Sequence, residues 1–179
     1  MKSILVLLAF ILLSFSPTVE KKITKTGNIT FEASVPSFEE VKAKNETVTC
    51  ILNTENGEIA ALALMKGFRF KVALMEEHFN ENYIESSKYP KATFKGKIEK
   101  FDVSKLSSAE QKFNIKGKLE LHGKTKDLNI IGKIKKNGET INLVSNFSVN
   151  VDDFDIEIPS VVSKKLSKQV NITLDFDLK

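Results

Sequence analysis

The residues that could carry out chemistry in this chain of 179 residues are few and scattered. Cys50 is the only cysteine, and it lies in the strand-like run Val48–Leu52 with no histidine near it in the sequence to lower the pKa of its thiol. His78 and His122 could bind a metal ion, but no cluster of Cys, Asp or Glu accompanies them at ligand spacing. The sequence therefore predicts no nucleophile and no metal site, and we expect Cys50 to be a small buried residue.

The acidic residues, like Cys50, give no indication of a catalytic site. Glu76-Glu77 and Asp152-Asp153 are adjacent pairs, and adjacent side chains diverge on regular structure. General acid–base chemistry needs two groups that converge on one substrate and whose environments separate their pKa values. We therefore expect a protein that is not an enzyme and that has no cofactor.

The elements that must position these residues are mostly strands. Apolar and polar residues alternate through 170–178, 113–121 and 29–33, and successive side chains of a strand point to opposite faces. Asn56-Gly57 and Asn137-Gly138 are strong hairpin signals, because both central residues of a type I′ turn need positive φ. The expected strands lie near residues 23–33, 47–55, 58–65, 67–73, 92–102, 112–122, 126–136, 140–150 and 169–178.

One segment, residues 74–87, has a helical rather than a strand pattern. Met75, Phe79 and Tyr83 are spaced by four and would share one helical face, whereas the glutamates between them can face water. We expect one or two short helices here, ended by Pro90.

Strands with one apolar face predict either a closed barrel or a two-sheet sandwich. Closure is favoured because it removes exposed edges. Gly96, Gly117 and Gly132 fall at inward positions, where glycine permits the sharp bends of a barrel. The fold class we expect is all-β, a single antiparallel barrel of about eight strands with the short helices near 74–87.

The N-terminus has the three parts of a secretory signal. Lys2 supplies the positive charge, Ile4–Leu13 form an apolar run too short to span a bilayer, and small residues follow it. We expect residues 1–18 to be a signal peptide, with the cleavage point left open by Pro17, and residues 19–179 to form one exported domain, periplasmic or secreted. An uncleaved N-terminal anchor is the alternative.

The net charge of +4 comes almost entirely from lysine, since Arg69 is the only arginine. We expect no nucleic-acid partner, because arginine carries most bidentate recognition of phosphate and guanine. Lys112, Lys116 and Lys118 alternate along a polar strand face, which predicts a solvated face that discourages edge-to-edge association. Peripheral contact with anionic lipid head groups is the alternative.

Three segments carry a resemblance to a known family. Residues 78–96 read HFNENYIESSKYPKATFKG, residues 117–126 read GKLELHGKTK, and residues 153–156 read DFDI. In order and spacing these segments resemble the signatures of the YceI-like family. Asp155 stands where the family usually has glycine, and Val149–Val151 lacks an arginine often found there.

The resemblance implies a lipocalin-like barrel, usually exported and not known for catalysis, that binds a long apolar molecule such as a polyisoprenoid inside. The partner would be an isoprenoid, a quinone or a fatty-acid-like lipid. Phenylalanine suits such a wall because it has no polar atom that needs a partner. The predicted ligand-binding residues are Phe31, Phe68, Phe70, Phe79, Tyr83, Phe94, Ile98, Phe113, Ile115, Leu119, Ile130, Phe147, Ile172, Leu174 and Phe176.

The two histidines have different expected roles. His78 lies in the family signature, and we expect its ring to hydrogen-bond the backbone near the mouth of the barrel, with a contact to a ligand head group as the alternative. His122 precedes Gly123 in a predicted turn, and we expect it to be exposed.

The sequence alone leaves two functions open. An eight-stranded barrel can hold one small ligand, or its own side chains can fill it. A hollow barrel would sequester or transport a lipid, whereas a filled barrel would be an interaction or scaffold protein that uses its lysine-rich face. The oligomeric state is also open, a homodimer included.

Overall fold

The computed structural model describes residues 20–179, so the signal peptide predicted at 1–18 lies outside the described residues. The chain is mostly strand, with short helical turns between the strands. In chain order the elements are β1 (Lys21–Ser34), β2 (Lys42–Asn53), β3 (Glu58–Leu64), η1 (Met65–Gly67), β4 (Arg69–Phe70), α1 (Ala73–His78), η2 (Phe79–Tyr83), β5 (Lys91–Ile98), η3 (Val103–Lys105), β6 (Gln111–Leu121), β7 (Lys124–Asn137), β8 (Thr140–Asn150), η4 (Val151–Phe154), η5 (Ser160–Val162) and β9 (Leu166–Leu178).

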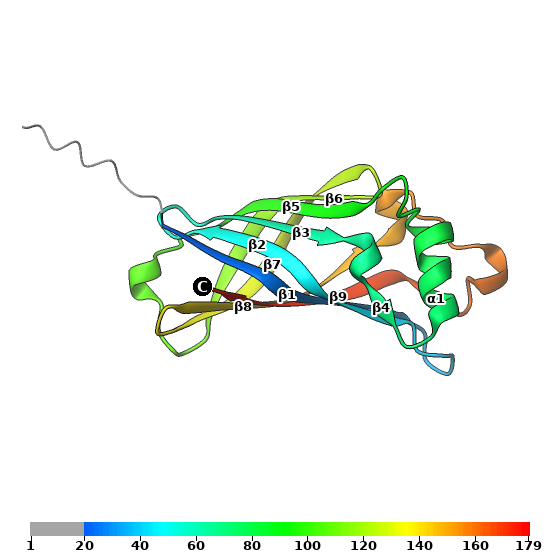
Figure 1. Ribbon diagram of the computed structural model, residues 1–179, viewed down its shortest axis with the longest axis horizontal. Helices are drawn as coiled ribbons and strands as arrows, with labels where there is room; N and C mark the ends of the chain where they lie inside the picture. Colours follow the sequence, from blue (N-terminus) through cyan, green and yellow to red (C-terminus); the bar gives the residue numbers. More distant parts are fainter. Residues whose placement is uncertain (1–19) are drawn as a thin grey trace, which may run out of the picture.

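The strands form a closed antiparallel barrel, drawn out along one axis (Figure 1). They are hydrogen-bonded in the order β1-β9-β8-β7-β6-β5-β3-β2, and the pairing of β1 with β2 closes the ring of eight. The two-residue strand β4 adds to the beginning of β2. The predicted fold class is confirmed, and the sandwich alternative is wrong, because every long strand has a partner on both sides.

The alternation of apolar and polar residues fixes which side chains face inward. Along β7, Ile130, Gly132 and Ile134 are buried while the residues between them are exposed. The predicted inward glycines also meet a steric requirement. A Cβ at Gly96 or Gly117 would collide with a carbonyl oxygen of the facing strand and with the ring of Phe94. Because neither residue has a Cβ, the strands approach closely and the ring covers both glycines.

The hairpins form as predicted, but the turn geometry does not lie where the Asn-Gly signals indicated. Gly57 and Gly138 have positive φ, of 74° and 58°, and the asparagines before them do not. The β6–β7 turn is the one with two consecutive positive φ values, 50° at His122 and 72° at Gly123. At the β7–β8 turn the difference arises because the loop consists of residues 138 and 139, so Asn137 already belongs to the strand.

The predicted helical segment is confirmed as helix α1 followed by a π-helical turn, η2. The strand expected at 67–73 is wrong beyond Arg69 and Phe70. Its pairing stops because the carboxylate of Glu76 turns back onto it. Oε1 lies 2.6 Å from Nη1 of Arg69, and Oε2 accepts from the Phe70 backbone N–H at 3.2 Å.

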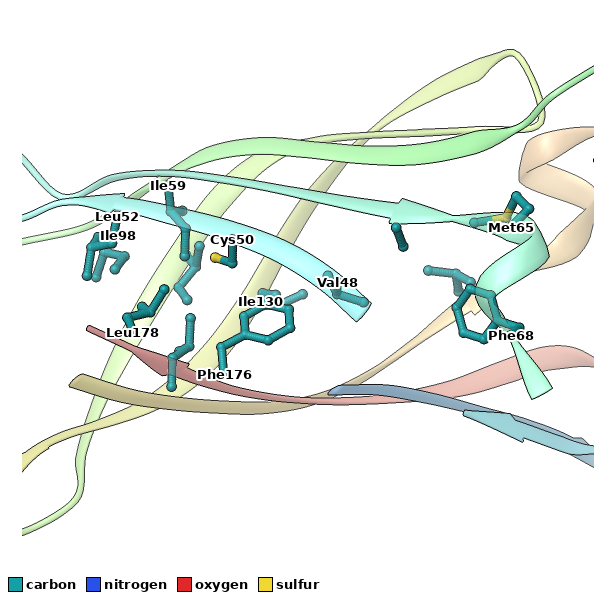
Figure 2. Packing of buried hydrophobic residues seen from close by; sticks show 14 of the residues in the cluster. Val48, Cys50, Leu52, Ile59, Met65, Phe68, Ile98, Ile130, Phe176 and Leu178 are labelled. Carbon is teal, nitrogen blue, oxygen red and sulfur yellow. The ribbon is translucent and has the colours of Figure 1, made fainter. Parts of the chain in front are cut away.

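The two ends of the barrel differ. At one end, side chains from five strands pack together with at most 1% exposure: Leu52, Ile98, Ile134, Ile141 and Leu178. Figure 2 shows Leu52, Ile98 and Leu178 gathered at this end, away from Met65 and Phe68. Helix α1 lies at the opposite end, together with the loops at 35–41 and 155–165 (Figure 1).

Candidate functional site

The half of the barrel toward α1 is hollow. Its interior is a cavity of about 410 Å³, within the range of about 300–1,000 Å³ that is usual for small-molecule sites. The floor is made by Ile59, Ile115, Leu143 and Phe176, just above the packed end. The cavity opens between α1 and the two loops at 35–41 and 155–165. The interior is therefore filled at one end and open at the other.

Most of the predicted ligand-binding residues line this cavity. Two do not, Ile98 and Phe113. Ile98 is 1% exposed within the packed end, and the ring of Phe113 packs against Phe101 with centroids 6.2 Å apart. Both point inward as predicted, but they lie below the floor. The predicted residues that do line the wall are Phe31, Phe68, Phe70, Phe79, Tyr83, Phe94, Ile115, Leu119, Ile130, Phe147, Ile172, Leu174 and Phe176.

Among the lining residues that sequence reasoning missed, two groups differ from the rest. Strands β3 and β5 contribute alanines, Ala61, Ala63 and Ala92, whose small size leaves room opposite the phenylalanines. Ala61 and Ala63 are spaced by two, which was a usable signal. Alanine has little β-propensity, however, so the residue type alone did not indicate an inward strand position. The loop after η4 contributes Ile158, and the short helix η5 that follows in it contributes Val162. No strand pattern marks that loop, so only its position in the fold shows its role.

A cluster of four phenylalanine rings holds the mouth in shape. The Phe31 ring centroid lies 5.2 Å from that of Phe68, 5.7 Å from Phe70 and 5.3 Å from Phe79. The Phe79 ring is also 5.9 Å from Phe68 and 5.3 Å from Phe70. Such tilted and edge-to-face pairs stabilise beyond their buried area, by about 0.5–1.5 kcal/mol each. The helical segment is thereby fixed against β1 and β4.

Polar side chains that line the cavity lie mainly at its mouth. Glu39, His78, Lys165 and Ser167 border the opening. Ser145 is the polar side chain in the deeper wall, and its hydroxyl donates to the Ile131 carbonyl at 2.8 Å. Because that hydroxyl already has a partner, the deep wall offers a ligand apolar surface and no free donor.

The structure places His78 at the mouth, on the exposed end of α1. The predicted hydrogen bond from its ring to the backbone is absent within residues 20–179. Contact with a ligand head group stays a prediction for this residue.

The prediction that His122 is exposed is wrong, since only 9% of the residue is accessible. Its Nδ1 lies 2.9 Å from the Phe154 carbonyl oxygen and its Nε2 lies 3.0 Å from Glu85 Oε2. The Tyr89 ring packs edge-on at 4.4 Å. The turn itself is at the surface, as predicted. The residue is buried because the segments at 85–89 and 154–155 fold over it.

Cys50 is fully buried, as expected. Burial raises the pKa of its thiol to about 12, so the thiol is protonated at neutral pH and is a poor nucleophile. Among residues 20–179, no three side chains of His, Cys, Asp and Glu come together in a way that could hold a metal ion. The same part of the chain contains no helix that is long and apolar enough to cross a bilayer.

The lysine-rich strand face is partly neutralised by acidic neighbours, although Lys112 has no ion pair within residues 20–179. Lys116 Nζ lies 2.7 Å from Glu99 Oε1, Lys118 Nζ lies 2.9 Å from Asp127 Oδ1, and Lys124 Nζ pairs with Asp155 at 2.6 Å. A face of exposed ion pairs has a weak net field. These ion pairs weaken the predicted attraction of this face to anionic lipids, which stays a prediction.

Comparison with known proteins gives consistent matches for the fold. The model of the YceI-like domain matches residues 13–178. Among solved structures, a polyisoprenoid-binding domain from Saccharophagus degradans, implicated in plant cell wall breakdown, is 12% identical with a TM-score of 0.78, covering 90% of this chain and 99% of that domain. BcnA of Burkholderia cenocepacia is 14% identical, with a TM-score of 0.69 and coverage of 83% and 94%.

The YceI protein of Campylobacter jejuni is 17% identical, with a TM-score of 0.60 and coverage of 81% of this chain and 89% of that protein. At such identities the likeness concerns the fold. No curated protein matches the chain.

Proposed function

Because this chain belongs to the YceI-like family, we propose that it binds a long apolar molecule, an isoprenoid or a related lipid, in the cavity between the packed end and α1. The observation that carries the proposal is the hollow, phenylalanine-lined half of the barrel, with its polar side chains gathered at the mouth. The similar fold of a domain described as binding polyisoprenoids supports it.

The burial energy is sufficient for this function. About fifteen buried carbon groups, three isoprene units, contribute about 12 kcal/mol at about 0.8 kcal/mol each. With a loss of about 4 kcal/mol for association, the lower end of the usual range, about 8 kcal/mol remains, which corresponds to a Kd of about 1 μM. A longer chain that fills the cavity further binds more tightly.

The role that we propose is binding without bond making. The Ser145 hydroxyl is engaged by a backbone carbonyl, the Cys50 thiol is protonated and buried, and the His122 ring is held away from the cavity wall. Sequestration or transport of the lipid outside the cytoplasm agrees with the signal-like residues 1–18. The filled-core scaffold loses its main premise, since half of the barrel is open.

Mass spectrometry of an organic extract tests the proposal. The mature protein is purified gently from its own source and extracted, and the same preparation is then exposed to added isoprenoid alcohols, quinones and fatty acids. A stoichiometric long-chain species, in the extract or after addition, is the expected result. A clean extract combined with no uptake of any added lipid would overturn the proposal.

A further inference from the structure

The cavity ends on a floor of closely fitted side chains, and two glycines set the depth of that floor. A Cβ at Gly27 would lie 2.6 Å from Cδ1 and 2.9 Å from Cε1 of the Phe176 ring, so the ring has room against β1 only because Gly27 has no side chain. A Cβ at Gly132 would lie 2.6 Å from Cδ1 of Ile115 and 2.8 Å from Cδ1 of Leu143. These floor side chains therefore lie over glycines and leave the space above them open.

The pairing of β8 with β9 shows that the floor is a sharp boundary. Ile141 and Leu178 are paired in the packed end, and both are fully buried. The next inward pair is Leu143 with Phe176, each 2% exposed, and both residues border the cavity. The inward pairs beyond it all line the cavity wall: Ser145 with Leu174, Phe147 with Ile172, and Val149 with Val170. The interior thus changes from filled to hollow within two residues along each strand.

The space above the floor limits the length of a bound chain. The cavity of about 410 Å³ holds about fourteen carbon groups, close to three isoprene units, at about 30 Å³ for a group the size of a water molecule. The chain has no path into the packed end, because Ile134, Ile141 and Leu178 are fully buried there. Carbons in excess of the capacity stay at the mouth or outside it.

We propose that Phe176, Ile115 and Leu143 form a length stop, and that the protein selects apolar chains of about three isoprene units. This inference rests on the proposed function, because it concerns the far end of a chain bound in the same cavity. Each unit added up to the stop buries further carbons and tightens binding. A unit added beyond the stop buries little and leaves the affinity nearly unchanged. Phe176 and Gly132 are then residues that determine specificity for chain length.

A series of isoprenoid alcohols of two, three, four and five units tests the stop, in competition with a fluorescent isoprenoid analogue. We expect Kd to fall at least about tenfold from two to three units and to change less than about threefold from three to five. Phe176→Ala leaves a cavity with room for about five carbons, one isoprene unit, so the plateau should begin at four units. Phe113→Ala is the matched control, because its ring also points inward but lies below the floor, and its plateau should still begin at three.

Gly132→Ala moves the stop in the opposite direction without emptying a buried site. The added methyl group displaces the terminal atoms of Ile115 and Leu143, and the packed end leaves them only the cavity to move into. Binding of the three-unit alcohol should weaken about tenfold, and binding of the two-unit alcohol should stay within about threefold. Urea unfolding checks each variant, and Gly132→Ala decides the question if Phe176→Ala does not fold.

The outcomes separate the length stop from ligand binding itself. Affinity that still rises steeply from three to five units would overturn the stop. A plateau that folded Phe176→Ala and Gly132→Ala leave unmoved, or that Phe113→Ala moves as far as Phe176→Ala, would overturn it as well. In each of these cases the proposed function stands, since the alcohols bind. Failure of every alcohol to bind would overturn the proposed function and the length stop with it.

Discussion

Two substitutions in strand β3 distinguish a ligand that binds inside the hollow half of the barrel from one that binds on the outer surface. Ala61 lines the cavity beside its cross-strand partner Phe94, whereas Ala60, the residue before it, is exposed on the outer face. Ala61→Phe inserts a ring into open space, and Ala60→Phe places the same ring in water. Strands tolerate aromatic residues well, so both variants should fold.

The size of the effect follows from the room that the ring occupies. The added ring displaces about five ligand carbons, and at about 0.8 kcal/mol for each buried CH₂ the ligand loses about 4 kcal/mol. Since each 1.4 kcal/mol is about a tenfold change in Kd, Ala61→Phe should weaken binding of a cavity-filling chain about 1,000-fold. The Ala60→Phe variant should bind like the original protein.

The assay is titration with a fluorescent isoprenoid analogue, with urea unfolding of each variant as the check on folding. The reasoning fails if Ala61→Phe is as stable as Ala60→Phe and still binds the analogue with unchanged affinity. That outcome would mean that the ligand lies outside the cavity. A shorter ligand, of about two isoprene units, should lose less affinity, since it can occupy the space that remains.

Three further predictions concern the described residues outside the cavity. His122→Ala should lower the free energy of unfolding by about 1–3 kcal/mol in urea, because the Glu85 carboxylate and a backbone carbonyl lose their partner; an unchanged midpoint would argue that the contact is incidental. The Cys50 thiol, with its pKa raised to about 12 by burial, should react with a thiol reagent in native protein only as fast as the chain opens, and reaction at the rate of a free thiol would contradict that burial. The hydrogen bond from Ser104 lowers the pKa of Asp102 to about 2, so this turn is stabilised above pH 3.8 and loses that stabilisation as the pH falls through about 2; NMR titration should show the low pKa, and Ser104→Ala should raise it.

The sequence predicted whether a side chain points into the barrel better than it predicted how far along the barrel that side chain lies. Alternation alone places Ile98, Phe113 and Ile115 on the inner face, and all three do point inward. Whether an inward residue lies in the packed end or in the cavity depends on how far each strand is shifted against its neighbours. The β5–β6 register sets Ile98 beside Ile115, and Ile115 forms the floor while Ile98 lies below it. That register arises from long-range pairing, which no local pattern reports.

Long-range contacts also explain why the exposure of His122 was predicted wrongly. A turn residue before glycine is exposed in most hairpins, and the local sequence carries no further information. Its burial comes from Glu85 and Phe154, which are 37 and 32 residues away in the chain. The helical segment was predictable because its spacing of four is local. Its position at the same end of the barrel as the loops at 35–41 and 155–165 was not, because these segments come together only in the folded chain (Figure 1).

The two ends of the barrel have different roles: the packed end stabilises the fold, and the open end of the same strands binds the ligand. The packed end buries large aliphatic side chains almost completely, and each such side chain contributes about 1.5–3 kcal/mol. The open end forgoes packing inside, so its shape depends on the contacts among the phenylalanine rings and on the Arg69–Glu76 pair around the mouth. A ligand that enters supplies the missing interior contacts and therefore stabilises the folded chain, by an amount that grows with its concentration relative to Kd. Substitutions at the packed end should consequently change stability at constant affinity, whereas those that line the cavity should change affinity more than stability.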